Sequence, residues 1–240
     1  RNMDTMMKIG KTLTIFLIVA GFFACNDEDN SVPFEVIGDV YVIKRTINDE
    51  VKYANAYVAW GNQPMSHAEV TTPTAANFTL DPASENLNTY AKEPALAEYS
   101  TAAPVQGNYQ FLVINEDITH ESADLLDFDD IDFTPISSAD MVNNVLSVQW
   151  ETNSVAEGYQ IRLINQSGDI AFFSVALPEQ MVRLDIGTNA ASGAWYETPE
   201  PGNVYTLEFL TIRYEDDATS LNAAKNIQEV AVTEQEVTWQ

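Results

Sequence analysis

For most of its length the chain alternates apolar and polar residues in short runs. Examples are "DVYVIKR" (39–45), "YANAYVAW" (53–60), "NYQFLVIN" (108–115), "LSVQW" (146–150), "YQIRLIN" (159–165), "VYTLEFLTIRY" (204–214) and "IQEVAVTEQEVTW" (227–239). Val, Ile, Tyr and Phe are common in these runs, and Gly, Pro, Asn and Asp lie between them. A period of two between turn residues is typical of antiparallel sheets with one face in water. The pattern predicts an all-β fold made of sandwiches.

One apolar run near the start breaks this alternation. Leu13 to Phe23 is continuously apolar or small, Lys8 and Lys11 precede it, and Ala24 follows it. A positive start, an apolar stretch and a small residue are the three parts of a secretory signal. The run is shorter than the roughly 20 residues that a membrane-spanning helix needs. Residues 1–24 are therefore predicted to be a signal peptide.

Cys25, the single cysteine of the chain, stands directly after this run. The sequence Phe22, Phe23, Ala24, Cys25 resembles the lipobox of bacterial lipoproteins. The resemblance implies that Cys25 becomes the lipid-modified first residue of the mature chain, and several acyl chains are enough for stable membrane anchoring. The alternative is a structural or reactive thiol.

The tract "NDEDN" (26–30) follows Cys25 immediately. It resembles the acidic export signal of lipoproteins from Bacteroidota-type bacteria, which implies a place on the outer face of the outer membrane. The alternative is an ordinary solvated tether over residues 25–32. In that case the protein could equally lie on the periplasmic face of the membrane. We expect an outer-membrane lipoprotein exposed at the cell surface.

The charge balance excludes several partners. The chain carries 36 Asp and Glu against 11 Lys and Arg, a net charge of −25. Such a polyanion repels phosphate backbones and anionic lipid head groups, so we expect no nucleic-acid partner and no membrane contact apart from the lipid anchor. With one cysteine the chain forms no internal disulfide, so its stability must come from a hydrophobic core.

The second half has the more specific motifs. The order "VLSVQW", "GYQIRLIN" and "PEPGNVYTLEFLTIRY" resembles a fibronectin type III domain over residues 135–240. The resemblance places Trp150 on strand B, Tyr159 on strand C and Tyr205 at the start of strand F. Tyr205 would be the corner tyrosine, whose hydroxyl bonds back to the backbone.

The segment "GTNAASGAWYETPE" (187–200) is longer than the usual turn between strands E and F of that family. Trp195 and Tyr196 lie within it, and aromatic rings exposed on a loop are suited to stacking on sugar rings. We predict these two residues as the ligand-binding site. The alternative is burial in the core, the commoner place for tryptophan.

The first half, residues 33–121, has a similar strand rhythm and is predicted to be an Ig-like sandwich. Residues 122–134 are predicted to be an acidic linker at which the two tandem domains hinge. Its carboxylates make it a candidate calcium site, because calcium takes six to eight oxygen ligands and favours such clusters. The candidate ligands are Asp127, Asp129, Asp130 and Asp132. The alternative is a solvated edge strand protected by charge, with Phe128 facing a core.

Catalysis has little support in the sequence. The two histidines, His67 and His120, lie on separate predicted segments without a metal-ligand spacing, and a serine nucleophile elbow is absent. We therefore predict a non-catalytic, lipid-anchored binding or spacer module for a protein or glycan partner, with no cofactor unless calcium binds. The alternative function is a glycan-binding or glycan-processing accessory lipoprotein.

Overall fold

The computed structural model describes residues 32–189, 191–216, 218–219 and 225–240. The predicted signal peptide, Cys25 and the tract 26–30 lie outside these residues. The described chain is all-β apart from a short 3-10 turn, η1 (Leu96–Glu98). The fold class predicted from the alternating pattern is therefore confirmed.

The first half is a sandwich of two sheets. Its strands are β1 (Val36–Ile47), β2 (Glu50–Gly61), β3 (His67–Thr71), β4 (Asn77–Thr79), β5 (Asp81–Pro82), β6 (Thr89–Lys92), β7 (Gly107–Asn115) and β8 (Ile118–Leu126). One sheet has the order β1-β2-β6-β5 and the other β4-β3-β7-β8. In the letters of the fibronectin type III family, these are A-B-E, with β5 beyond E, and C′-C-F-G.

The second half repeats this arrangement. Its strands are β9 (Ile136–Val142), β10 (Val145–Trp150), β11 (Gly158–Ile164), β12 (Ile170–Ser174), β13 (Leu177–Pro178), β14 (Arg183–Gly187), β15 (Gly193–Trp195), β16 (Val204–Tyr214) and β17 (Ile227–Thr238). The order β9-β10-β14 is A-B-E, and β12-β11-β16-β17 is C′-C-F-G, with β15 added beside β12. Both halves therefore have the strand order of a fibronectin type III domain.

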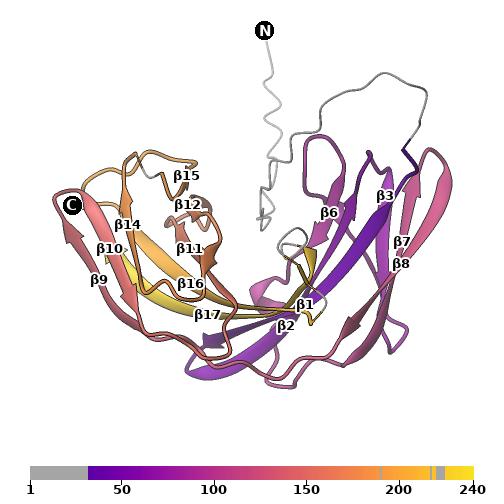
Figure 1. The fold of residues 1–240 in the computed structure, drawn as a ribbon, viewed down its shortest axis with the longest axis horizontal. Helices are drawn as coiled ribbons and strands as arrows, with labels where there is room; N and C mark the ends of the chain where they lie inside the picture. The colour runs from indigo at the N-terminus through magenta and orange to yellow at the C-terminus, as the bar shows by residue number, and fades with distance from the viewer. Residues whose placement is uncertain (1–31, 190, 217, 220–224) are drawn as a thin grey trace, which may run out of the picture.

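A single ten-stranded sheet runs through both sandwiches (Figure 1). It forms because β17, the last strand of the second sandwich, pairs with β1, the first strand of the first sandwich, in parallel. Parallel neighbours need a long connection, and here the rest of the chain supplies it. The halves are thus joined by backbone hydrogen bonds.

Tight hairpin turns set the register of several strand pairs. Asn48 and Asn143 start two-residue turns between β1 and β2 and between β9 and β10, and both residues of each turn have positive φ. This geometry is that of the type I′ turn, whose twist matches the strands and which Asn tolerates well. The long β1–β2 pairing, from Val36↔Gly61 to Ile47↔Glu50, follows from the first of these turns.

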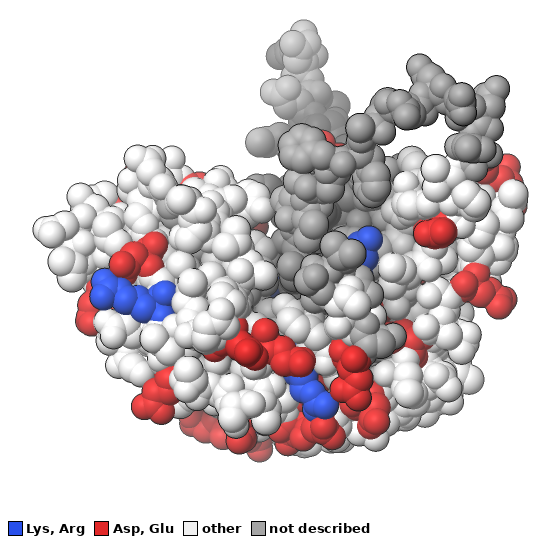
Figure 2. All heavy atoms as spheres, viewed as in Figure 1, with Lys and Arg blue, Asp and Glu red and all other residues white. Residues whose placement is uncertain are grey.

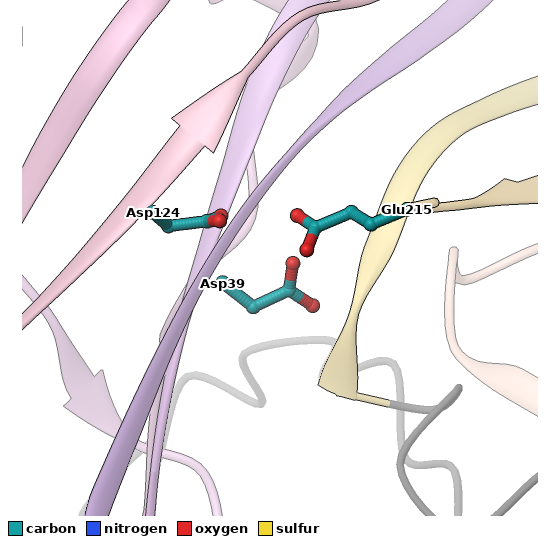
Figure 3. A group of neighbouring side chains, drawn as sticks. All are labelled: Asp39, Asp124 and Glu215. Atoms are coloured by element: carbon teal, nitrogen blue, oxygen red, sulfur yellow. The ribbon is translucent and has the colours of Figure 1, made fainter. Parts of the chain in front are cut away.

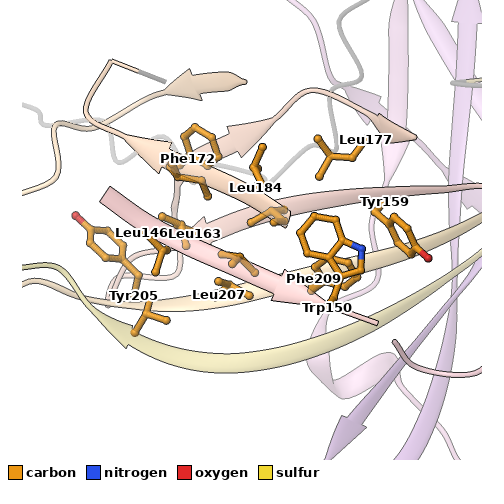
Figure 4. Close-up of a cluster of buried hydrophobic side chains, with 14 of the residues drawn as sticks. Leu146, Trp150, Tyr159, Leu163, Phe172, Leu177, Leu184, Tyr205, Leu207 and Phe209 are labelled. Atoms are coloured by element: carbon orange, nitrogen blue, oxygen red, sulfur yellow. The ribbon is translucent and has the colours of Figure 1, made fainter. Parts of the chain in front are cut away.

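Each sandwich has its own core. The second core is strongly aromatic: Trp150, Tyr159 and Phe209 lie together, with ring centroids 4.8 to 5.7 Å apart (Figure 4). The first core packs smaller residues against its rings, including Ala59 and Ala68, which are fully buried. Trp150 lies on strand B and Tyr159 on strand C, as the family resemblance implies.

The corner tyrosine differs from its expected form. The Tyr205 hydroxyl lies 3.4 Å from a carboxylate oxygen of Glu197, so its acceptor is a side chain where the backbone was expected. The expected bond is found in the first sandwich, where the Tyr109 hydroxyl donates to the Val105 carbonyl at 2.7 Å. Tyr109 lies near the start of β7, the F strand of that sandwich.

Candidate functional site

The junction between the two sandwiches, which we call the seam, carries an unusual concentration of charge. It is centred on the parallel pairing of residues 42–45 of β1 with residues 229–232 of β17. The chain has 11 Lys and Arg residues, and four of them lie at this junction. They are Lys44, Arg45, Arg162 and Arg213.

On one face of the seam two arginines share one carboxylate. Arg45 of β1 lies 2.7 Å from Glu208 of β16, and Arg162 of β11 lies 2.6 Å from the other oxygen of the same carboxylate. Glu208 is 7% exposed. Burial alone would raise the pKa of Glu208, but Arg162 and Arg45 outweigh it and hold the pKa below its usual value. The ionised carboxylate therefore ties the two sandwiches together.

On the opposite face the segment between the sandwiches packs onto the seam. β8 continues to Leu126 and β9 starts at Ile136, so the irregular segment is 127–135. The carboxylate of Glu229 on β17 accepts the backbone N–H groups of Asp129 and Ile131 at 2.6 and 2.8 Å. Lys44 donates to the Ile131 carbonyl at 2.9 Å.

A second set of bonds fixes the end of this segment. The Thr211 hydroxyl donates to the Thr134 hydroxyl at 2.8 Å, and the Thr233 hydroxyl donates to the Thr134 carbonyl at 2.9 Å. Thr134 is fully buried. A segment expected to act as a hinge is therefore bonded along its length to the strands on both sides of the seam.

The four carboxylates predicted as calcium ligands lie on this segment. Asp129 pairs with Arg213, and Asp130 pairs with Lys44 at 2.8 Å and accepts the Tyr53 hydroxyl at 3.1 Å. Phe128 is buried in the first core and its neighbour Asp127 is exposed, as the alternation indicated. Two of the four predicted ligands are thus turned toward cationic side chains.

Three other carboxylates converge at the end of the seam. Asp39 lies on β1, Asp124 lies on β8, and Glu215 follows β16 directly, so both sandwiches contribute (Figure 3). An oxygen atom from each lies within 4.8 Å of the others. Within the described residues, this is the one group of three or more acidic or metal-ligating side chains whose ligand atoms lie this close together.

Asp39 is the unusual member of this group. It is 1% exposed, and its Oδ1 has no hydrogen-bond partner. Its Oδ2 receives one long bond, of 3.5 Å, from the Ile227 N–H. Burial, followed by the neighbouring carboxylates of Asp124 and Glu215, raises the pKa of Asp39 well above its ordinary value.

A cavity of about 500 Å³ lies beside this group. It is lined by residues of both sandwiches and of the segment between them, among them Asp124, Asp127, Asp129, Arg213 and Glu215. Acidic side chains also gather on the outer surface around the junction (Figure 2). The cavity gives solvent and small ions access to two of the three converging carboxylates.

The predicted ligand-binding pair, Trp195 and Tyr196, is divided between core and surface. Trp195 lies on β15 and packs on the second core, edge-on to Trp239 at 5.2 Å, while its Nε1 donates to the Gly187 carbonyl at 2.9 Å. Tyr196 is 59% exposed. The segment 187–200 is thus partly an extra edge strand, and only Tyr196 offers an open ring.

A small polar pocket of about 260 Å³ includes Glu197, the residue that follows Tyr196 in the sequence. It is lined by Asn165, Gln166, Ser167, Glu197, Gly202, Asn203, Val204 and Tyr205. Amide, hydroxyl and carboxylate groups of this kind both donate and accept hydrogen bonds. The pocket was not found from the sequence, because its residues come from three separate segments.

The histidines lie apart from both sites. His67 Nε2 is 3.5 Å from a carboxylate oxygen of Glu69, and the His120 ring lies 4.5 Å from the Phe34 ring. Neither residue lines the acidic cavity. Within the described part of the chain, none of the helical segments has the length and hydropathy needed to cross a membrane.

Comparison with known proteins gives neither a family nor a close relative. No family model matches the chain, and no curated protein matches it. A two-domain fibronectin type III segment from chicken tenascin aligns with 10% identity and a TM-score of 0.29, over 76% of this chain and 91% of that one.

Two further solved structures align over 85% of this chain. They are a biofilm-associated protein BSP domain, with 12% identity and a TM-score of 0.23, and a tetra-tandem repeat of a large adhesion protein, with 11% identity and a TM-score of 0.21. The alignments span 29% and 50% of those chains. TM-scores and identities this low assign neither a function nor a partner. The fold assignment rests on the strand order.

Proposed function

We propose that the chain is a non-catalytic, lipid-anchored module of the cell envelope that acts as a rigid spacer or binding arm for a protein or glycan partner. The observation that carries the proposal is the continuous sheet through β1 and β17. Sandwiches joined only by a linker would move independently by default. Here backbone pairing and buried ion pairs oppose such motion.

The positions of the chain ends support the same function. The described chain begins at the outer end of the first sandwich, and its C-terminus lies at the outer end of the second (Figure 1). An anchor at Cys25 would therefore attach close to one end and present the second sandwich at the other. This separation is what a spacer requires.

The anchor and the exposure are tested together on intact cells. Cells that express the native chain and cells that express Cys25→Ala are treated with a protease that does not cross the outer membrane. We expect the native chain to be membrane-bound and degraded, and Cys25→Ala to be released from the membrane fraction. A native chain that resists the protease on intact cells but is cut after lysis contradicts surface exposure.

Lack of catalysis is tested separately. The purified chain is assayed against glycoside, ester and peptide substrates, and we expect no turnover. Turnover that disappears on changing a single carboxylate, such as Glu197→Gln in the polar pocket, would contradict the non-catalytic assignment.

A glycan is the second candidate partner, favoured by the exposed ring of Tyr196 and by the polar pocket that includes Glu197, the next residue in the sequence. A ring that stacks on a sugar and nearby amides that bond its hydroxyls are the elements of carbohydrate recognition. The test is a glycan array with the native chain, Tyr196→Ala and, as control, Leu125→Ala, an exposed position on the first sandwich. A blank array, or binding that survives Tyr196→Ala, excludes this site.

A further inference from the structure

The group formed by Asp39, Asp124 and Glu215 is difficult to explain as part of the fold alone. Three carboxylates in close contact repel one another, and a buried carboxylate without a partner is costly. Asp39 stands in the middle of an apolar strand, "VIGDVYVI" (36–43), with one oxygen unbonded and a nearly inaccessible side chain. Its carboxyl group is directed toward Glu215 (Figure 3), and its single hydrogen bond is the long one, of 3.5 Å, from the Ile227 N–H to Oδ2.

The spacing of the three groups fits a metal ion. Calcium binds oxygen at 2.3–2.6 Å, so two oxygens on opposite sides of the ion lie about 4.8 Å apart. The observed oxygens all lie within that separation of one another. An ion placed between them would supply the missing partner of the Asp39 Oδ1 and neutralise most of the repulsion.

We propose that Asp39, Asp124 and Glu215 bind a calcium ion that bridges the two sandwiches at the end of the seam. Asp39 and Asp124 belong to the first sandwich and Glu215 to the second, so the ion adds a direct link between them. This site is distinct from the residues 127–132 to which the sequence pointed, and it does not depend on what the module binds.

The chemistry of the ligands favours calcium over other common ions. All three are carboxylates, and a set made only of oxygen ligands suits hard cations, whereas zinc and copper sites rely mainly on His or Cys. Magnesium requires shorter bonds and near-octahedral geometry, while calcium tolerates irregular sites completed by water. The adjoining cavity of about 500 Å³ has room for those water ligands.

The direct test uses the full purified chain, stripped of metal with EDTA and desalted. Calcium chloride is titrated into it by calorimetry, with magnesium chloride as comparison, and thermal unfolding is followed at each concentration. We expect an apparent Kd of about 0.1–1 mM, the range of extracellular calcium modules. At a calcium concentration about 100-fold above the Kd, the unfolding temperature should rise by about 5–10 °C.

Two variants place the binding at this site. Asp39→Asn keeps the shape of the side chain and should reduce the calcium affinity at least tenfold. Both the heat of binding and the rise in unfolding temperature should fall as a result. Glu215→Gln changes the member from the second sandwich and should act in the same direction. Asp132→Asn removes an exposed carboxylate of the neighbouring segment and should leave binding unchanged.

No calcium heat and no thermal shift in the native chain would overturn the proposal, and a more stable Asp39→Asn variant would then indicate that Asp39 is simply protonated. Equal binding by native chain and Asp39→Asn would place the ion elsewhere and also overturn it. Should Asp39→Asn fail to fold by circular dichroism, Glu215→Gln gives the decision.

Discussion

The two sandwiches have the same strand order but contribute opposite sheets to the shared one. The first gives its A-B-E sheet, through β1, and the second gives its C′-C-F-G sheet, through β17. The remaining sheets, β4-β3-β7-β8 and β14-β10-β9, stay separate. One fold therefore presents two different edges, and the seam joins an A edge to a G edge.

This difference between the two joined edges shows which strand would be left unpaired in each sandwich alone. An open edge strand exposes unpaired N–H and C=O groups that attract other chains. Residues 42–45 of β1 and 229–232 of β17 would be such edges in isolated halves, and here they satisfy each other. The seam thus protects both edges while it fixes the orientation of the sandwiches.

The largest expected effect comes from Glu208→Gln at the seam. The change leaves Arg45 and Arg162 facing each other without their shared counter-charge. Breaking a buried pair in this way costs about 3–5 kcal/mol in free energy of unfolding. The measurement is denaturant unfolding, with Asp185→Asn as control, because Asp185 pairs with Arg183 on the surface of the second sandwich. Equal losses in the two variants would contradict the structural role of Glu208.

Acidification should remove part of the same stabilisation. Because the folded-state pKa of Glu208 is lowered, its contribution is fully present above the unfolded pKa, near 4.3, and disappears as pH falls through the lower folded value. The difference in unfolding free energy between native chain and Glu208→Gln should be constant above about pH 5 and shrink below about pH 4. A difference that does not vary with pH would mean that the pKa of Glu208 is the same in the folded and unfolded chain, and would contradict its lowering by Arg162 and Arg45.

Gly38→Ala tests the first sandwich without touching the second. A Cβ at Gly38 would lie 2.2 Å from a ring carbon of Phe111, closer than any real contact. The overpacking should cost about 1–3 kcal/mol. Gly187→Ala in the second sandwich is the control, since its Cβ would meet Val145 at an ordinary 3.8 Å. Hydrogen exchange measured by mass spectrometry should show increased exchange in β1 and β7 for Gly38→Ala and little change for Gly187→Ala.

The smallest effect compares the two tyrosines. Tyr109→Phe loses a 2.7 Å bond to the Val105 carbonyl and a 2.8 Å bond from the Asn55 amide. Tyr205→Phe loses only long contacts of 3.4 Å, with Glu197 and Asn203. We expect a loss of about 1 kcal/mol for Tyr109→Phe and a smaller loss for Tyr205→Phe. Thermal unfolding of both variants measures the order. A larger loss at Tyr205 would mean that the second sandwich, and not the first, depends on its corner tyrosine.

Much of the fold was predictable because it is local. Alternation located the strands, and the positions of Trp150, Tyr159 and Tyr205 fitted one family. The first sandwich gave a weaker signal, although "GNYQFL" (107–112) in β7 parallels "GNVYTLEFL" (202–210), which leads into β16. That parallel was the available clue to a second domain of the same type.

The seam and its carboxylates were not predictable, because they depend on strands far apart in sequence. Pairing of Val42 with Glu229 brings the start of the chain to its end, and no local pattern encodes that register. The converging group likewise joins residues 39, 124 and 215. A signal was present in Asp39, a charged residue inside an apolar strand. The acidic run 127–132 was predicted as the calcium site instead, because its carboxylates are adjacent in sequence.

A distance measurement across the seam shows whether it fixes the two sandwiches relative to each other. Spin labels are placed at Ile118→Cys on the first sandwich and Val142→Cys on the second, both at positions more than half exposed, with Cys25→Ser to avoid a third label. Pulsed electron paramagnetic resonance then gives the distribution of distances between the labels. We expect one narrow peak that broadens in Glu208→Gln. A broad distribution in the otherwise native chain would mean that the sandwiches move freely and that the seam does not fix their orientation.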